Sequence, residues 1–397
     1  MTAAAPPTLP TLQVRHRPGI IELGPGQPDP ALLPVRAVRD AVDATLEADG
    51  VAALSYGAAA GPGRLREWLA AWVGQREGRL LQPGEVLITG GASSALAHVC
   101  QAFTAAGDVV LCESPTYHLA ARTLRDHRLS PVGVATDGDG IVLAALEESL
   151  ASVRSSGGRV SLLYTVPAHN NPTGRTTTSQ RRERVLEIAA REGVLLVEDD
   201  VYRELTFEAQ GLPALGRSPA EERGVVRLGS FAKLVAPGLR VGWLTAPRDL
   251  VSRLAAAGWL DSGGGTSHFA AMALTTMGGT GAIDHHITRL CAAYAVRRDA
   301  LVDALRQALP PGSQVVSPAG GFFVWATLPG AVDAAALLPR AEAAGVGYVP
   351  GARFGLPGAP VPHSSLRLAF CAHPAETLRE GARRLGQVVV RPAAEAP

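Results

Sequence analysis

The sequence predicts an α/β fold in which a large domain, built on a mainly parallel sheet, carries a smaller α+β domain. Two observations predict this fold. From Val86 to Leu254, short apolar runs alternate with segments of helical period, a pattern typical of an open, mainly parallel α/β sheet. From about Leu254 onward the pattern changes to glycine-broken segments, a long helix and strands of alternating hydrophobicity, which is typical of an α+β unit.

Each element follows from its local pattern. Apolar residues recur at helical spacing over Pro34–Glu47, which predicts an amphipathic helix, and a second helix is expected over Leu65–Val73. Short apolar runs predict buried strands over Val86–Thr89, Val109–Cys112, Val160–Val166, Val194–Val197 and Val225–Leu228. A long helix is predicted over Ile287–Leu309, and further strands over Gly320–Trp325, Val346–Val349 and Ser365–Phe370.

Composition limits the classes of partner. The 397 residues carry 37 Lys plus Arg against 36 Asp plus Glu, so a net charge of +1 favours neither nucleic acid nor a membrane surface. The cysteines show no metal-like or redox-like spacing and are expected to be small buried residues of a reducing compartment: Cys100, Cys112, Cys291 and Cys371. The N-terminus shows no secretory signal and no run is long enough to span a bilayer, so a cytoplasmic protein with a small-molecule partner and no metal is expected.

Polar or small residues follow five of the predicted strands at the point where each strand ends. They are Ser93, Tyr117, Asn171, Asp199 with Tyr202, and Ser230 with Lys233. Ligands of open α/β sheets bind at the carboxyl edge of the strands. Five such residues with compatible chemistry therefore predict a binding site at that edge.

Two of these strand ends have a chemistry of their own. Gly91, Ala92 and Ser93 open a helix, where free backbone N–H groups and the helix dipole form an anion cradle. In the turn Asn171-Pro172-Thr173-Gly174, the proline fixes the turn and leaves the Asn171 amide free to donate to a phenolate-like oxygen.

The stretch Gly229–Trp243 carries the lysine most suited to chemistry. Lys233 follows a buried strand, Ser230 precedes it by three residues, and Arg240 comes seven residues later after a Pro-Gly turn. An amine that can form a Schiff base, beside a hydroxyl and a guanidinium that can hold an anion, suits a phosphorylated aldehyde cofactor.

Three further residues stand outside the strand ends. Gly26, in a rigid Gly-Pro turn, either lets a substrate approach the backbone or belongs to a simple connector. Tyr56 precedes a glycine loop and the helix of Leu65. Period-two alternation from Ser365 to Phe370 turns Arg367 away from the neighbouring apolar face.

The lysine segment resembles that of the fold type I pyridoxal phosphate aminotransferases of class I and II, whose usual pattern is Ser-x-Ser-Lys followed by a Pro-Gly turn and an Arg. Ala232 stands where the second serine is usual. The resemblance extends from Gly26 to the last helix. It implies the transferase fold with a mainly parallel, seven-stranded type of sheet, and pyridoxal 5′-phosphate as cofactor.

The resemblance also implies a role for each residue. Lys233 would form the internal aldimine and move a proton at the substrate α-carbon, Asp199 would pair with the pyridine nitrogen, and Tyr117 would stack on the ring. Asn171 and Tyr202 would bind the phenolate oxygen. The phosphate would be held by Gly91, Ala92, Ser93, Ser230, Arg240 and, from the other subunit of a homodimer, Tyr56. Arg367 would bind the substrate α-carboxylate, with Gly26 and Asn171 also lining the substrate site.

The function that the resemblance implies is transfer of an amino group between an α-amino acid and a 2-oxo acid. The alternative is a biosynthetic enzyme that uses the same carbanion for elimination, cyclisation or carbon–carbon bond formation. Ala232, the altered phosphate turn and the loose Gly263–Gly265 stretch, expected near the substrate entrance, keep this alternative open. A regulator fused to a winged-helix domain is disfavoured, because only 55 residues precede Tyr56.

The same patterns divide the chain into regions. Residues 1–18, rich in Ala and Pro, are expected to form a flexible tail. Residues 51–284 are expected to form the large cofactor-binding domain. Residues 19–50 and 285–397 are expected to form the small domain together.

Overall fold

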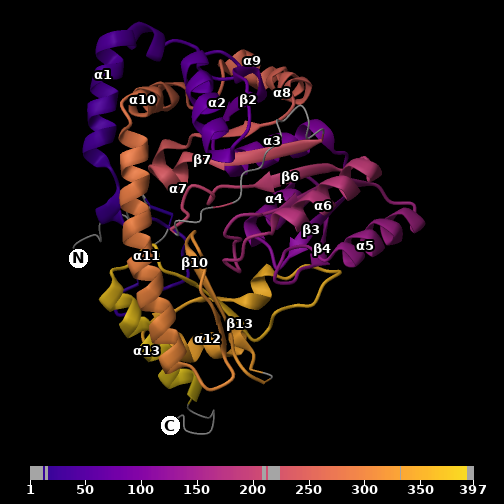
Figure 1. Cartoon of the computed structure of the whole chain (residues 1–397), viewed down its shortest axis with the longest axis vertical. Coiled ribbons are helices and arrows are strands. Elements are labelled where there is room, and N and C mark those ends of the chain that lie inside the picture. The colour runs from indigo at the N-terminus through magenta and orange to yellow at the C-terminus, as the bar shows by residue number, and fades with distance from the viewer. Residues whose placement is uncertain (1–11, 14–16, 208–211, 213–223, 331, 391–397) are drawn as a thin grey trace, which may run out of the picture.

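The computed structural model describes residues 12–13, 17–207, 212, 224–330 and 332–390. Most of the predicted tail, residues 1–11 and 14–16, therefore lies outside the described residues. Figure 1 shows a broad sheet layer flanked by helices, and below it a smaller sheet packed beside the long helix α11 (Ala282–Ala308).

The larger sheet has seven strands in the order β2-β8-β7-β6-β5-β3-β4. Their bounds are β2 Val86–Thr89, β3 Val109–Ser114, β4 Ser130–Ala135, β5 Val160–Thr165, β6 Leu195–Asp199, β7 Val225–Ser230 and β8 Gly242–Thr245. Neighbours from β4 to β7 pair in parallel, and β8 runs antiparallel to both β7 and β2. The predicted α/β class and mainly parallel sheet are confirmed.

Helices cover both faces of this sheet because its strands are apolar on both sides. One core joins the sheet to α3 (Ala92–Phe103), α4 (His118–Asp126) and α8 (Arg248–Ala255). On the opposite face, a second core joins it to α5 (Leu143–Ser155) and α6 (Ser179–Glu192). Gly193 ends α6 in the left-handed conformation, as its position after the charged helix predicts.

The smaller sheet has the order β12-β13-β10-β9, and β1 pairs separately with β11. The bounds are β1 Ile21–Glu22, β9 Gln314–Val316, β10 Phe323–Thr327, β11 Val346–Gly347, β12 Val349–Pro350 and β13 Ser365–Ala369. The single strand predicted over 346–349 is thus two short strands in different sheets. Helices α11, α12 (Ala334–Ala343) and α13 (Ala375–Val390) pack against this part of the chain.

The segment after Leu254 is more helical than its glycines predict. It contains α9 (Gly258–Gly263) and α10 (His268–Gly279). Gly278 lies inside α10, where the indole of Trp68 packs against it. A Cβ at this position would lie 2.5 Å from Trp68 Cε2, so only glycine leaves room for the ring. Tertiary packing therefore overrides the low helix propensity of glycine here.

The first two helices are longer than expected. They are α1 (Val35–Ala53) and α2 (Gly63–Glu77). The apolar stripe of α1 is only partly buried, since Val35 and Leu46 are exposed.

Short 3-10 turns complete the described elements at Pro30–Leu32, Pro83–Glu85, Pro237–Leu239 and Gly351–Phe354. In the described chain, no helix is both long and apolar enough to cross a membrane.

Candidate active site at the carboxyl edge of the seven-stranded sheet

Five strands end at one edge of the large sheet. Strands β3, β5, β6 and β7 are mutually parallel, and β2 runs in the same direction because both it and β7 are antiparallel to β8. Their carboxyl ends therefore meet on one side, facing the smaller sheet and α11 (Figure 1). The residues that follow these strands therefore share one edge of the sheet, as predicted.

Lys233 lies on α7 (Phe231–Leu234), the single turn that follows β7. Its Nζ donates a hydrogen bond to the backbone oxygen of Gly26 at 3.1 Å and lies 5.3 Å from the ring centre of Phe322. Burial lowers the pKa of Lys233, and the nearby Arg367 guanidinium adds to this decrease. The amine is therefore easier to deprotonate than a lysine in water.

Asp199 ends β6 and is buried. Its Oδ2 accepts a hydrogen bond from the Tyr164 hydroxyl at 2.6 Å, whereas Oδ1 is buried without a partner among the described residues. Burial raises the pKa of Asp199 to about 6, against the opposing effect of the Tyr164 hydrogen bond. A buried carboxylate oxygen with no donor is costly unless a ligand supplies one.

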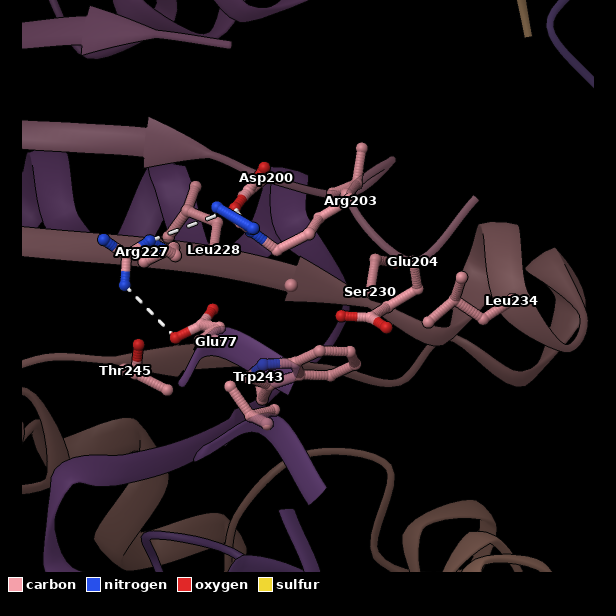
Figure 2. A pocket seen from close by; sticks show the side chains of 13 residues that line it. Glu77, Asp200, Arg203, Glu204, Arg227, Leu228, Ser230, Leu234, Trp243 and Thr245 are labelled. Carbon is pink, nitrogen blue, oxygen red and sulfur yellow. Dashed lines mark hydrogen bonds and ion pairs between the residues drawn. The ribbon is translucent and has the colours of Figure 1, made fainter. Parts of the chain in front are cut away.

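Asp200, the next residue, belongs to a different environment. Its Oδ2 accepts from Arg203 Nε at 2.8 Å and lies 4.0 Å from Arg227 Nε. Figure 2 shows these residues around a pocket beside β7, where Arg227 also reaches Glu77 at 3.4 Å. Asp200 Oδ1 is also buried without a partner among the described residues, but the Asp200 carboxylate is paired with these arginines, whereas no salt bridge joins Asp199 to a described arginine or lysine. Asp199 is therefore the carboxylate better placed to receive a cationic ligand.

Asn171 and Arg367 join the two sheets across the site. Arg367 Nη1 donates to Asn171 Oδ1 at 2.7 Å, and Nη2 donates to the Gly24 oxygen at 2.7 Å. Since its amide oxygen is engaged, Asn171 has its amide nitrogen left as a donor for a ligand. That this amide donates to a phenolate oxygen stays a prediction.

Arg367 lies in the middle of β13 and is buried, with its guanidinium close to two aromatic rings. Its Cζ lies 4.1 Å from the ring centre of Phe323 and 4.8 Å from that of Phe354. Nε is buried without a hydrogen-bond partner, and no described carboxylate forms a salt bridge with this arginine. Burial lowers the pKa of Arg367 to about 10, so it stays charged at neutral pH and can receive an anion.

A second anion-binding arrangement lies at the start of α3. Gly91 precedes this helix with φ +95°, and Arg240 Nη2 donates to the Gly90 oxygen at 2.9 Å. A Cβ on Gly91 would lie 2.8 Å from that Nη2 atom, so only glycine fits between the turn and the guanidinium. Ala92 and Ser93 follow as the first helical residues, with Ser93 exposed.

The Ser230 side chain caps the helix turn that carries Lys233. It is buried, and its Oγ accepts from the backbone N–H of Ala232 at 3.1 Å, so it caps α7. The Ser230 hydroxyl oxygen is therefore already engaged as an acceptor. Its O–H remains able to donate to an anion, because a hydroxyl both accepts and donates.

Two of the predicted tyrosines, Tyr202 and Tyr117, lie near the residues of this site. Tyr202 is buried against Phe322 and Phe323, with ring centres 5.4 and 6.0 Å away. Tyr117 directly precedes α4 and is half-buried. Burial raises the pKa of Tyr117; the nearby Asp199 raises it further and Arg367 lowers it. Gly26 contacts the ring of Phe323, whose Cζ would lie 2.5 Å from an added Cβ.

Tyr56 is the predicted residue that the chain does not bring to the site. Its side chain is 87% exposed, and among the described residues it makes no hydrogen bond or ring contact with the others. The adjoining backbone packs against Gly264, where an added Cβ would lie 2.8 Å from the Gly57 oxygen and 2.9 Å from Tyr56 Cβ. The Gly263–Gly265 stretch therefore packs against the loop that carries Tyr56. Its place near the substrate entrance stays a prediction.

Comparisons with known proteins agree with this geometry. The family model described as aminotransferase class I and II matches residues 18–385. Aromatic-amino-acid aminotransferase 1 of Thermococcus litoralis is 33% identical over 375 residues, covering 93% of this chain and 88% of that protein. The 2-aminoadipate transaminase of Thermus thermophilus is 34% identical over 383 residues, covering 95% and 92%. A solved kynurenine aminotransferase of Pyrococcus horikoshii, in complex with PMP, has a TM-score of 0.86 at 32% identity, covering 94% and 91%.

The chain belongs to aminotransferase class I and II. It is a pyridoxal phosphate-dependent transferase whose substrates are small molecules, namely amino acids and oxo acids. The site fits this cofactor on its own evidence. It offers a buried carboxylate oxygen without a donor at Asp199, a glycine turn at Gly91 beside Arg240, and a partly buried amine at Lys233.

Three residues of this aminotransferase site are absent from the sequence-based prediction. Tyr164 supports Asp199, Phe323 lies under Arg367 and beside Gly26, and Glu113 accepts from the Val166 N–H and from Asn170 Nδ2. Two of them could have been found from the sequence, because Tyr164 is a phenol and Glu113 a carboxylate in otherwise apolar strands. Phe323 gave no such signal, because apolar residues are expected in a strand.

Proposed function

We propose that this chain transfers an amino group between an α-amino acid and a 2-oxo acid at the edge formed by Lys233, Asp199, Asn171 and Arg367. The observation that carries the proposal is the buried Arg367 guanidinium. It has an unpartnered Nε and no described carboxylate in a salt bridge. A buried cation of this kind favours a ligand with a carboxylate, which every α-amino acid and 2-oxo acid has.

The cofactor would be held at both ends by this chain. Asp199 would accept from the pyridine nitrogen, the Asn171 amide and Tyr202 would bind the phenolate oxygen, and Tyr117 would stack on the ring. The α3 N-terminus would hold the phosphate together with Gly91, Ala92, Ser93, Ser230 and Arg240. Pyridoxal phosphate, when bound, supplies an aldehyde that condenses with amines and a ring that withdraws electrons from the substrate α-carbon.

Lys233 is the group that we expect to exchange a proton at the substrate α-carbon. A general base works best when its pKa lies near the working pH, and burial moves the pKa of Lys233 down toward that range. The Gly26 oxygen, 3.1 Å from Nζ, gives the amine a fixed direction. Lys233 is therefore both the attachment point and the proton carrier in this proposal.

Arg367 would orient the substrate through its α-carboxylate. The rings of Phe323 and Phe354 lie close to the buried guanidinium, and Asn171 and Gly24 accept hydrogen bonds from its two terminal nitrogens. A guanidinium fixed in this way gives a carboxylate one geometry, which lysine could not reproduce. The substrate α-carbon would then lie between this contact and Lys233.

We also propose a homodimer. Tyr56 is almost fully exposed, and the apolar side chains beside it on the end of α1 are exposed as well, with Val51 at 86% and Leu54 at 74%. Apolar side chains clustered on a surface favour a protein partner. A second copy covering this end of α1 would let the exposed Tyr56 reach the partner's phosphate site.

Two further assignments stay proposals. We propose the domain division at residues 51–284 and at 19–50 with 285–397, since the seven-stranded sheet lies within the first range and the smaller sheets within the others. We also propose a cytoplasmic location. The four cysteines are free thiols in the structure, in keeping with a reducing compartment.

The test of the reaction is a single half-turnover. Protein loaded with pyridoxal phosphate is mixed with a panel of α-amino acids without any oxo acid, and products are identified by mass. A transferase should release one equivalent of the matching 2-oxo acid per site and then stop until an oxo acid is added. Continued turnover to any other product would refute transamination and support the biosynthetic alternative.

The test of the lysine is covalent trapping. Loaded protein is reduced with borohydride, digested and searched by mass spectrometry for the lysine that carries the cofactor. We expect the adduct on Lys233 and none in Lys233→Ala. An adduct on another lysine would refute the assignment of this residue.

A further inference from the structure

A buried tyrosine supports the carboxylate that faces the cofactor site. Tyr164 lies on β5, next to β6 in the sheet, and its side chain is fully buried. Its hydroxyl lies 2.6 Å from Asp199 Oδ2, within the range of a strong hydrogen bond to a charged acceptor. Neither the family pattern in the sequence nor the proposed function assigns this residue a role.

Because of this contact, the two oxygens of the Asp199 carboxylate have different surroundings. Oδ2 is taken by Tyr164, and Oδ1 has no partner among the described residues. Rotation of the carboxylate would break a buried hydrogen bond, so the contact holds the Asp199 side chain in one orientation. A fixed orientation with a single free oxygen suits one donor, such as a ring N–H.

The contact also acts on the charge of Asp199. Several titratable groups surround this carboxyl: Tyr164 on β5, Glu113 on β3, Asp200 after β6, Lys233 on α7, and the phenols of Tyr117 and Tyr202. Burial and Asp200 favour its protonated form, whereas the Tyr164 hydrogen bond and Lys233 favour the ionised form. The phenol donates to the charged state, which is the state that a cationic ring nitrogen requires.

We propose that Tyr164 is a positioning residue that keeps Asp199 ionised and directs its Oδ1 toward the pyridine nitrogen of the cofactor. This inference rests on the proposed role of Asp199. It differs from a packing role, because a packing role would use the ring of Tyr164 and not its hydroxyl.

The chain offers a matched control. Tyr294 on α11 is also fully buried, and its hydroxyl has no hydrogen-bond partner among the described residues. Tyr164→Phe and Tyr294→Phe each remove one buried oxygen, so both test the same loss of volume. Only the first removes a donor from Asp199.

The experiment measures cofactor binding, not turnover. Apoprotein of each variant is titrated with pyridoxal phosphate from pH 5 to 8.5, and thermal unfolding checks that each apoprotein is folded. Tyr164 favours the ionised Asp199, and a pKa shift of about one unit corresponds to a tenfold change, so Tyr164→Phe should bind about tenfold more weakly near neutral pH. The pH at which affinity falls off in acid should move upward, because Asp199 loses a group that favours its ionised form. Tyr294→Phe should match the wild type in both respects.

The variant Asp199→Ala separates the role of Tyr164 from the role of Asp199. If Tyr164 acts through Asp199, the Tyr164→Phe effect should vanish in the Asp199→Ala background. An unchanged affinity and pH profile in Tyr164→Phe, with a clear loss in Asp199→Ala, would overturn the role of Tyr164 alone. Unchanged binding in Asp199→Ala would overturn the role of Asp199 and this inference with it.

Discussion

Asn171 Oδ1 accepts a hydrogen bond from Arg367 Nη1 at 2.7 Å, although 196 residues separate the two in the chain. Asn171 follows a strand of the seven-stranded sheet, and Arg367 lies within a strand of the smaller one. This contact joins the residue proposed to bind the cofactor ring to the residue proposed to bind the substrate carboxylate. Both proposals can therefore be tested at one position.

Asn171→Asp should make Arg367 less available to substrate. A carboxylate at this distance would pair with the guanidinium and compete with the substrate α-carboxylate. Since a hydrogen bond to a charged group contributes about 1.5–3 kcal/mol, the KM for the amino acid should rise about 10- to 100-fold. Steady-state kinetics check this, with Asn171→Ala as the uncharged control. Equal KM values for the two variants would contradict the proposed role of Arg367.

Gly91→Ala should weaken cofactor binding through Arg240. The new Cβ would meet Nη2 at 2.8 Å at a φ of +95°, so the guanidinium must move. Gly107→Ala is the matched control, because its φ is +91° and no atom lies within 4 Å of its Cβ position. Both variants should lose about 1–3 kcal/mol of stability from backbone strain. Only Gly91→Ala should bind pyridoxal phosphate about tenfold or more weakly, measured by titration of apoprotein. Equal affinities would mean that the phosphate lies elsewhere.

Gly264→Ala should displace the loop that carries Tyr56. Its Cβ would lie within 2.9 Å of Gly57 and Tyr56 atoms, whereas Gly281, with a similar positive φ, has no atom within 4 Å. If Tyr56 reaches the phosphate site of the partner subunit, Gly264→Ala should weaken cofactor binding and dimerisation, and Gly281→Ala should not. Titration and analytical ultracentrifugation measure both. An unaffected dimer with full cofactor affinity would count against the role of Tyr56.

Glu113→Gln should stabilise the apoprotein at alkaline pH. Burial raises the pKa of Glu113 to about 8, above the value of 4.5 for an unperturbed glutamate, so the folded state keeps its proton longer than the unfolded chain. Its contribution to stability is therefore complete below about pH 4.5 and is lost as the pH rises to about 8.

The glutamine introduced by Glu113→Gln would keep an oxygen to accept from Val166 and Asn170, and it has no proton to lose. The variant should gain roughly 4 kcal/mol relative to the wild type between pH 5 and pH 9. Urea unfolding at both pH values provides the measurement. A difference between the two proteins that does not change with pH would show that Glu113 is ionised in the folded state.

Much of this protein could be predicted from local patterns. Apolar runs that end in Asn171, Asp199 or Lys233 predicted both the strands and the edge at which they meet, because parallel strands share one direction. The helices of residues 258–279 were missed, since their glycines suggest breaks. They form because the missing side chains allow contacts such as that of Gly278 with Trp68.

The sequence by itself determined the strand ends, the lysine segment and the family to which they point, since these depend on residues close together in the chain. Only the tertiary structure decided which neighbours those residues have. Asp199 and Asp200 are adjacent in sequence, yet one faces Tyr164 and the other faces Arg203. Which side of the sheet each carboxylate occupies, and which group from another strand lies there, depends on strand order and packing, and no local pattern encodes either.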